Sequence, residues 1–287
     1  MSTTRLLSPL APATRPRDRR ARDWARAALV LVGHGSGYHG GANPGLLAQA
    51  AALRARGLFT EVRAAALYGA PDPEAALAGL DSARVYLAPL FLCAGHGLRV
   101  ALPRVLGLDG PVTRRGGQRF VLCPPLGLMP GLNRLILARA AEAARAQGLD
   151  PEAAALLLVG HGSPRDPASR RAAEWHGAGA RGSRTFGEVD IALLNQPPFL
   201  DEVLRRLTRP SIAVGLFADN ARHAGQDLPD AIARHAPVAV RYLGAIGTDS
   251  GIPDLVLDQV AAASLPHSQT NSTQPVSVRE LCRVLGW

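Results

Sequence analysis

An internal repeat constrains the fold of this sequence more than any other feature. Residues 28–36, Ala-Leu-Val-Leu-Val-Gly-His-Gly-Ser, recur at residues 155–163 as Ala-Leu-Leu-Leu-Val-Gly-His-Gly-Ser, at an offset of 127 residues (161 − 34 = 127). The same offset takes Val62 to Val189, Pro71 to Pro198, Val85 to Ile212 and His96 to His223. Apolar runs, prolines and a second histidine that stay in register indicate a duplication, so we expect two copies of one fold.

Each copy alternates short apolar runs with helical stretches. In the first copy the pattern predicts strands at 28–33, 61–67, 84–90 and 119–123, with helices at 44–56, 73–80, 98–106 and 131–146. In the second copy it predicts strands at 155–160, 188–194, 211–216 and 237–243. The apolar runs lack polar alternation, as expected of parallel strands covered on both faces. The sequence therefore predicts an α/β protein of two similar flavodoxin-like parallel-sheet domains.

The boundary between the copies is expected at Gly148-Leu149-Asp150-Pro151, where a glycine can close one helix and a proline prevents its continuation. This gives domains at 27–148 and 149–263. Residues 1–26 are predicted to be a basic disordered arm, and residues 264–287 a polar linker followed by a short C-terminal helix.

Composition excludes several classes of protein. The 287 residues are 47% apolar, enough to bury a core without disulfides or a structural metal. The cysteines, Cys93, Cys123 and Cys282, form no CxxC pair, which argues against a zinc ribbon and fits a reducing cytoplasm. The longest apolar runs are far shorter than a membrane span. We expect a cytoplasmic protein without a membrane partner.

The positive charge is concentrated at the N-terminus. The chain carries a formal net charge of +9, and residues 1–26 hold seven arginines against Asp18 and Asp23. The folded body is therefore much less basic than the whole sequence. Aromatic residues make up 5% of the chain, too few for a base-stacking surface, so we expect no nucleic-acid partner.

Four histidines lie where parallel α/β sheets bind ligands, beyond the carboxyl ends of the strands. His34 and His161 directly follow the first strands, and His96 and His223 lie shortly after the third strands, at the same spacing of 62 residues. If first and third strands are neighbours, each pair of imidazoles can share one ligand, and a divalent metal is the obvious candidate. His39, His176, His235 and His267 have no partner in the other copy, so we expect them at the surface or behind ligand-binding residues.

Small residues surround these histidines. Gly33 and Gly35, like Gly160 and Gly162, permit a tight turn and a close approach of a bulky ligand. Ser36 and Ser163 can cap the following helix or donate to an anionic group. Cys93 lies near His96, but its counterpart is Asn220, which favours a small apolar role over a metal ligand.

Several segments together resemble the class II tetrapyrrole chelatases of the CbiX and SirB type. They are the strand with His-Gly-Ser followed by Ala42-Asn43, the segment Pro89 to His96, Pro125-Leu126-Gly127, and His223-Ala-Gly-Gln-Asp227-Leu-Pro229. The resemblance covers about residues 28 to 260. It implies two α/β halves facing each other over a cleft, and insertion of cobalt or ferrous iron into sirohydrochlorin for cobalamin or sirohaem synthesis.

The chemistry of that reaction assigns the candidate residues. Two neutral histidines without a thiolate hold a divalent metal substrate weakly enough to release it, and one can accept a pyrrole proton. We expect metal and catalysis at His34 with His96 and at His161 with His223, leaving open which pair is active. Arginine forks suit the carboxylates of the tetrapyrrole. The expected substrate contacts are Ser36, Asn43, Arg99, Ser163, Arg222 and Asp227.

No nucleotide is expected, because a chain without lysine has no Walker lysine and no GxGxxG follows a strand. Duplication supplies both halves of a cleft, so a monomer is plausible.

The chain departs from the family at carboxylate positions. The family often has a glutamate just before the proline matching Pro71, whereas residues 68–70 and 195–197 contain no carboxylate. The first copy also lacks the aspartate of the HxxxDxP element and has one extra residue before Pro103. A non-catalytic carrier of metal or tetrapyrrole is the alternative.

Overall fold

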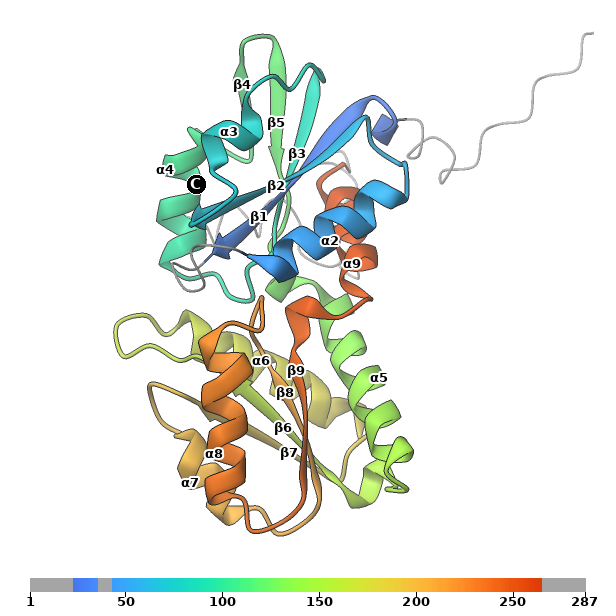
Figure 1. Ribbon diagram of the computed structural model, residues 1–287, viewed down its shortest axis with the longest axis vertical. Coiled ribbons are helices and arrows are strands. Elements are labelled where there is room, and N and C mark those ends of the chain that lie inside the picture. The colour runs from blue at the N-terminus through green and yellow to red at the C-terminus, as the bar shows by residue number, and fades with distance from the viewer. Residues whose placement is uncertain (1–22, 36–42, 265–287) are drawn as a thin grey trace, which may run out of the picture.

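The computed structural model describes residues 23–35 and 43–264, which form two α/β halves stacked along the long axis of the molecule (Figure 1). The first half contains β1 (Ala27–Gly35), α2 (Pro44–Ala55), β2 (Glu61–Tyr68), α3 (Pro73–Leu77), β3 (Arg84–Pro89), the π-helical turn η2 (Gly97–Ala101), α4 (Leu102–Leu106), β4 (Val112–Arg115), β5 (Gln118–Leu122), the 3-10 turn η3 (Leu126–Leu128) and α5 (Pro130–Ala146). The second contains η4 (Pro151–Ala153), β6 (Ala155–Gly160), α6 (Ala168–Ser183), β7 (Glu188–Leu193), α7 (Leu200–Arg206), β8 (Ser211–Gly215), the π-helical turn η5 (His223–Asp227), α8 (Leu228–His235), β9 (Val240–Ala245), η6 (Ile246–Thr248) and α9 (Ile252–Ala263).

The strand orders confirm the predicted fold class. The sheets run β2-β1-β3-β5-β4 and β7-β6-β8-β9, so the first and third strands of each half are neighbours, and every pairing is parallel except β4 with β5. The antiparallel β4 was not predicted. It returns to β5 through Gly116 and Gly117, both at positive φ, and a Gly-Gly pair is a known signal of such a hairpin.

The central strands are buried on both faces, which explains their continuous apolar sequence. Alternate residues of β1 point to opposite cores: Leu29 and Leu31 pack with α2 and α9, whereas Val30 and Val32 pack with α3 and α4. In β6, Leu156 and Leu158 belong to the same continuous core as Leu29. The two halves therefore share one hydrophobic core.

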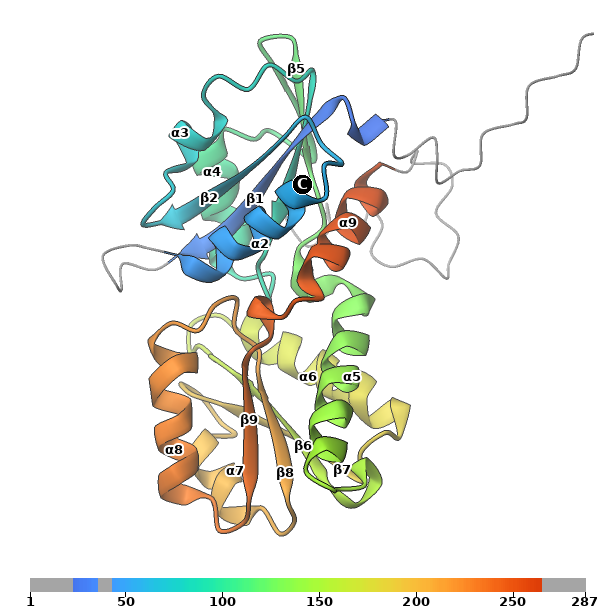
Figure 2. The same ribbon diagram turned by 45° about the vertical axis from the view of Figure 1, so that its right-hand side comes forward.

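The halves exchange their last helices. Helix α5 leaves the first half and contacts β8 and α6 of the second, while α9 leaves the second half and contacts α2 and β3 of the first. Figures 1 and 2 show α9 in red beside α2, and α5 in green along the second sheet. The boundary expected at 148/149 thus separates the sequence repeats but not the two packing units.

The repeat register changes by one residue after the second strands. Ala28 pairs with Glu61 and Ala155 with Glu188, which preserves the offset of 127 residues. Ala28 also pairs with Val85, whereas Ala155 pairs with Ser211, an offset of 211 − 85 = 126. The expected match of Val85 with Ile212 is therefore wrong, because Val85 corresponds to Ser211.

The predicted terminal segments lie mostly outside the described residues, which exclude 1–22 and 265–287. Residues 23–26 of the expected disordered arm are ordered, because Trp24 stacks on Phe59 with ring centroids 5.6 Å apart. Within residues 23–35 and 43–264, no helix is long and apolar enough to cross a membrane.

Two buried polar side chains hold the exchanged helices in place. Gln259 of α9 is fully buried and its Nε2 donates to the carbonyl oxygens of Pro89 (2.9 Å) and Pro124 (2.5 Å) in the first half. Gln49 of α2 donates to the carbonyl oxygens of Gly247 and Asp249 in the second half, both at 3.1 Å. These amides thus donate to main-chain carbonyls of the opposite half.

Replacing Gln259 by leucine should lower the free energy of unfolding by about 2 kcal/mol, because two buried carbonyl oxygens lose their donor. Urea denaturation of the full chain measures this change. Gln147→Leu is the matched control, since Gln147 makes one exposed hydrogen bond within α5 and its loss should change the value by less than about 0.5 kcal/mol. An equal effect of the two substitutions would contradict the anchoring role.

His176 of α6 is the one fully buried imidazole among the described residues. Neither ring nitrogen has a hydrogen-bond partner. Desolvation by burial lowers the pKa of His176 from 6.5 to about 4 and outweighs the opposite effect of the Gly127 backbone. His176 is therefore a neutral core residue, rather than the surface position that its lack of a partner in the repeat suggested.

The buried His176 should make the protein less stable in mild acid. As the pH falls below 6.5, His176 binds a proton in the unfolded chain, but in the folded protein it does so only near pH 4. Up to about 3 kcal/mol of the free energy of unfolding is therefore lost between pH 6.5 and pH 4. Urea denaturation at pH 7, 6, 5 and 4 should show a smaller loss for His176→Leu than for the wild type. His235→Leu, which leaves His176 in place, should keep the wild-type dependence.

Candidate functional site

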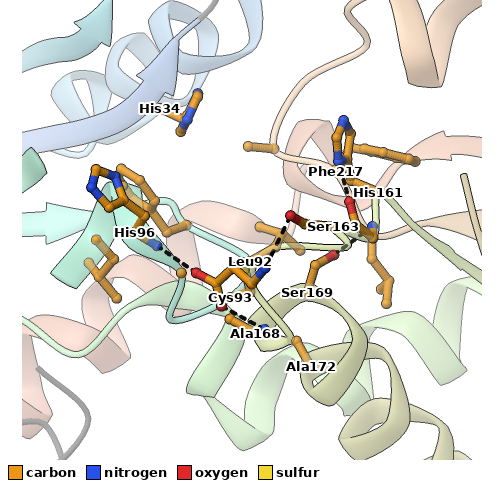
Figure 3. A pocket seen from close by; sticks show the side chains of 18 of the residues that line it. His34, Leu92, Cys93, His96, His161, Ser163, Ala168, Ser169, Ala172 and Phe217 are labelled. Carbon is orange, nitrogen blue, oxygen red and sulfur yellow. Dashed lines mark hydrogen bonds between the residues drawn. The ribbon is translucent and has the colours of Figure 1, made fainter. Parts of the chain in front are cut away.

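Two cavities lie between the halves at the carboxyl ends of the strands, the edge where the sequence places its histidines. The Asp166 cavity, about 410 Å³, is lined by His34, His96, His161 and Asp166 among others. The His223 cavity, about 820 Å³, is lined by His34, Tyr68, His161, Asp219 and His223 among others. In Figure 3, His34 and His96 approach the Asp166 cavity from the first half, and His161 and Phe217 from the second. His34 and His161 border both cavities.

The second half brings its two histidines together. His161 follows β6 and His223 begins η5 after the neighbouring strand β8. Their ring centroids are 4.8 Å apart with an angle of 72° between the ring planes. This is the proximity expected when the ends of a first and a third strand are neighbours.

Hydrogen bonds determine which ring nitrogen each histidine presents. His161 Nδ1 lies 2.7 Å from the carbonyl oxygen of Gly162, and His223 Nδ1 lies 2.8 Å from Asp227 Oδ2. Both oxygens are acceptors, so each Nδ1 donates its hydrogen and each neutral ring keeps a lone pair on Nε2. Asp227 is thus placed to orient and polarise His223, the usual role of a carboxylate behind a metal-binding histidine.

Asn195 is a site residue that the sequence reasoning missed. It follows β7, and its Nδ2 lies 3.3 Å from His161 Nε2. The nitrogen and oxygen of an asparagine amide are interchangeable by rotation, so Asn195 can present its oxygen to an ion bound at His161. The sequence signal that could have identified Asn195 is a polar residue at the end of the second strand of its half, 34 positions after His161.

Among the residues that the structure describes, the first half shows no equivalent of the His161–His223 ring contact. The π-helical turns η2 and η5 begin at Gly97 and His223, and Pro103 and Pro229 follow at the same distance, so Gly97 is the structural counterpart of His223. A Cβ atom added to Gly97 would lie 3.6 Å from His34 Nε2. The expected equivalence of His96 and His223 is wrong, because the one-residue change of register moves His96 to the position of Arg222.

His34 is surrounded by aromatic rings instead. Its ring centroid lies 5.0 Å from that of Tyr68 and 6.0 Å from that of Phe91, and within the described ranges it makes no ring contact with His96. His34 Nδ1 donates to the Gly35 carbonyl oxygen at 2.9 Å, which leaves Nε2 with its lone pair, as in His161. Within the described residues, His34 therefore lies on an aromatic surface, while His96 lines the Asp166 cavity without a ring contact to His34.

The main-chain amide of His96 contacts the other half. His96 N donates to Asp166 Oδ2 at 3.0 Å, and Arg99 Nη2 reaches the same oxygen at 3.1 Å. Burial raises the pKa of Asp166, but the amides of Ala168 and His96 and the charge of Arg99 lower it below its usual value. Asp166 is therefore an ionised partner of Arg99.

The remaining candidate residues have defined places. Asn43 lines the His223 cavity and donates to the Ala70 carbonyl oxygen at 2.6 Å. Ser163 lines the Asp166 cavity, and its Oγ accepts from the amides of Arg165 and Asp166, both at 3.3 Å, so it caps the turn before α6. Arg222 lies 3.5 Å from Asp227. Ser36 lies outside the described residues.

The cysteine near the site behaves as expected. Cys93 lines the Asp166 cavity and is a free thiol. Burial raises its pKa, which disfavours the thiolate that a metal would require. Across residues 23–35 and 43–264, no three or more His, Cys, Asp and Glu side chains gather as a metal site. The histidine pair is thus an open, low-denticity arrangement.

Comparison with known proteins places this geometry in a family. The family model CbiX matches residues 28–143 and 155–263, one segment in each half. The chain therefore belongs to the CbiX family of chelatases, which confirms the resemblance inferred from the motifs and its tandem form.

Individual relatives agree with this assignment. A probable sirohydrochlorin cobaltochelatase of Halobacterium salinarum is 29% identical over 270 residues, covering 83% of this chain and 92% of that protein. A solved structure of CbiX, described as the terminal enzyme of sirohaem biosynthesis in denitrifying bacteria, is 29% identical with a TM-score of 0.66, covering 84% of this chain and 100% of the other.

A multi-domain protein of Deinococcus radiodurans, described as structurally similar to chelatases with two additional domains, has a TM-score of 0.71 at 26% identity. The match covers 88% of this chain but 56% of that one, so our chain spans little more than half of that relative.

Proposed function

We propose that this protein inserts a divalent metal, cobalt or ferrous iron, into sirohydrochlorin without nucleotide hydrolysis. The single observation that carries the proposal is the His161–His223 pair at a cavity between two CbiX-type halves. The cobaltochelatase and sirohaem relatives support cobalt and iron, respectively, as the metal substrate. A cytoplasmic monomer is the setting in which we expect this reaction.

The histidine pair supplies the metal in this proposal. The Nε2 lone pairs of the two imidazoles bind Co²⁺ or Fe²⁺, that of His161 in place of its contact with the Asn195 amide nitrogen, because borderline divalent ions accept imidazole. With two imidazoles, and at most the Asn195 oxygen as a third ligand, the site remains open to the four nitrogens of the macrocycle. A closed four-ligand site would retain the ion instead. Weak, open coordination is what transfer of the metal requires.

His34 is our candidate for the proton acceptor. Insertion exchanges two pyrrole N–H protons for one M²⁺ ion, so two protons must leave the ring. His34 borders both cavities, faces the metal pair from the opposite half and presents Nε2 with a free lone pair. Tyr68 and Phe91 beside it offer flat apolar surface to the macrocycle.

The alternative function is a carrier that binds metal or tetrapyrrole without turnover. Its supporting observation is that the positions facing the two strand-end histidines hold Tyr68 and Asn195, where a carboxylate would assist proton removal. A carrier would bind both ligands and leave the insertion rate at that of the protein-free mixture.

Anaerobic absorbance spectroscopy of sirohydrochlorin with Co²⁺ and, separately, Fe²⁺ tests the proposal. The wild type should accelerate insertion, and His161→Ala and His223→Ala should each lower the rate by about 100-fold or more. His34→Ala should slow turnover similarly while leaving Co²⁺ affinity intact. His96→Ala is the matched control and should have a much smaller effect. A wild-type rate equal to the protein-free rate, with both ligands bound, would establish the carrier.

Loss of the carboxylate behind His223 should weaken the metal site. Asp227→Asn is expected to reduce Co²⁺ affinity by about 10- to 100-fold, because His223 loses the carboxylate that accepts its Nδ1 hydrogen and orients the ring. Titration of the visible Co²⁺ bands measures the affinity without tetrapyrrole. Asp230→Asn removes the same charge from the exposed start of α8 and should leave the affinity unchanged. An equal loss of Co²⁺ affinity in the two variants would show that the affinity depends on net charge and not on the His223–Asp227 hydrogen bond.

A further inference from the structure

Asp166 belongs to the second half, yet one of its carboxylate oxygens is bound by the first. Oδ2 accepts from the main-chain amide of His96 and from Nη2 of Arg99, at 3.0 and 3.1 Å. Oδ1 accepts from the amide of Ala168 at 3.0 Å, within its own half. The carboxylate therefore bridges the halves at the border of the Asp166 cavity.

The first-half partners form a carboxylate-binding arrangement by themselves. A guanidinium and a backbone amide converge on one oxygen atom, and both can donate charge-assisted hydrogen bonds to an anionic oxygen. The described lining of the Asp166 cavity is otherwise mainly apolar, and Asp166 is its only carboxylate. A carboxylate at the edge of a macrocycle bound in this cavity could form an ion pair with Arg99, which lies beside Asp166.

The contact of Asp166 with Arg99 is weaker than this geometry allows. Within the described structure Asp166 engages Arg99 through Nη2 alone, and the side chain of Arg99 is 44% exposed. Arg139, by contrast, holds Asp249 by a fork in which Nε and Nη2 bind separate oxygens at 2.9 and 3.2 Å. A single-oxygen pair at a surface contributes little, whereas a free carboxylate can align with both edges of the guanidinium.

We propose that Arg99 and the His96 amide form a subsite for a peripheral carboxylate of the substrate, and that Asp166 is an internal competitor which the substrate displaces. The inference rests on the proposed function for the identity of the ligand. It assigns Asp166 a role in substrate affinity at the border of the Asp166 cavity. Asp166 is thus a specificity-determining residue that does not touch the metal.

Binding of metal-free sirohydrochlorin, measured anaerobically by absorbance titration with a chelator present, tests the competition. Asp166→Asn removes the negative charge but keeps an oxygen that can accept from Ala168, so the fold should be retained. We expect it to bind sirohydrochlorin about fivefold more tightly than the wild type, and Arg99→Gln about fivefold more weakly. The double variant should match Arg99→Gln, because no competitor matters once the cation is gone.

Asp201→Asn is the matched control, since it breaks a different exposed ion pair, with Arg205 on α7, and should leave the affinity unchanged. Unchanged or weaker binding by Asp166→Asn, with a wild-type unfolding temperature, would overturn the competition. A gain that persists in the double variant would also overturn it, since Arg99 would then not be the contested group. If either of these results overturns the competition while the wild type still inserts metal, the proposed function is unaffected. If the wild type binds no sirohydrochlorin, both the competition and the proposed function are contradicted.

Discussion

The exchange of α5 and α9 between the two sheets is the constraint on which the site depends. Each helix packs on the sheet of the other half, so Leu29 of β1 and Leu156 of β6 lie in one continuous core. Buried apolar surface and the amide of Gln259 therefore fix the halves relative to each other. As a result the carboxyl ends of both sheets face one another, and loops from both repeats line the same cavities.

Duplication would make these loops equivalent, but one residue makes them different. Beyond the second strands the second repeat is one residue shorter, and Gly97 stands where His223 stands. The second half presents two imidazoles 4.8 Å apart, whereas the first presents His34 beside Tyr68 and Phe91. The two halves therefore present different side chains to the cavities that they share.

The polar contacts between the two halves differ in strength according to where they lie. Arg139 binds Asp249 by a fork where the exchanged α5 meets the turn before α9, and Gln49 and Gln259 are buried. Asp166 contacts Arg99 through one oxygen at an exposed edge. Strong contacts thus hold the shared core, and weaker contacts border the space that a macrocycle would enter.

The sequence by itself determined the α/β class, the duplication, nearly all the strands and the family, because apolar runs, the repeated His-Gly-Ser turn and the chelatase motifs are local patterns. It also placed His161 and His223 at one ligand edge, since neighbouring parallel strands end together. It could not reveal the exchanged helices, because α5 and α9 are apolar enough to pack on either sheet. Strand pairing alone decided the repeat register, which separates His96 from His223, and contacts across 34 to 70 residues of chain brought Asn195 to His161 and Asp166 to His96. Such contacts depend on how packed elements meet in space, and no spacing along the chain encodes that.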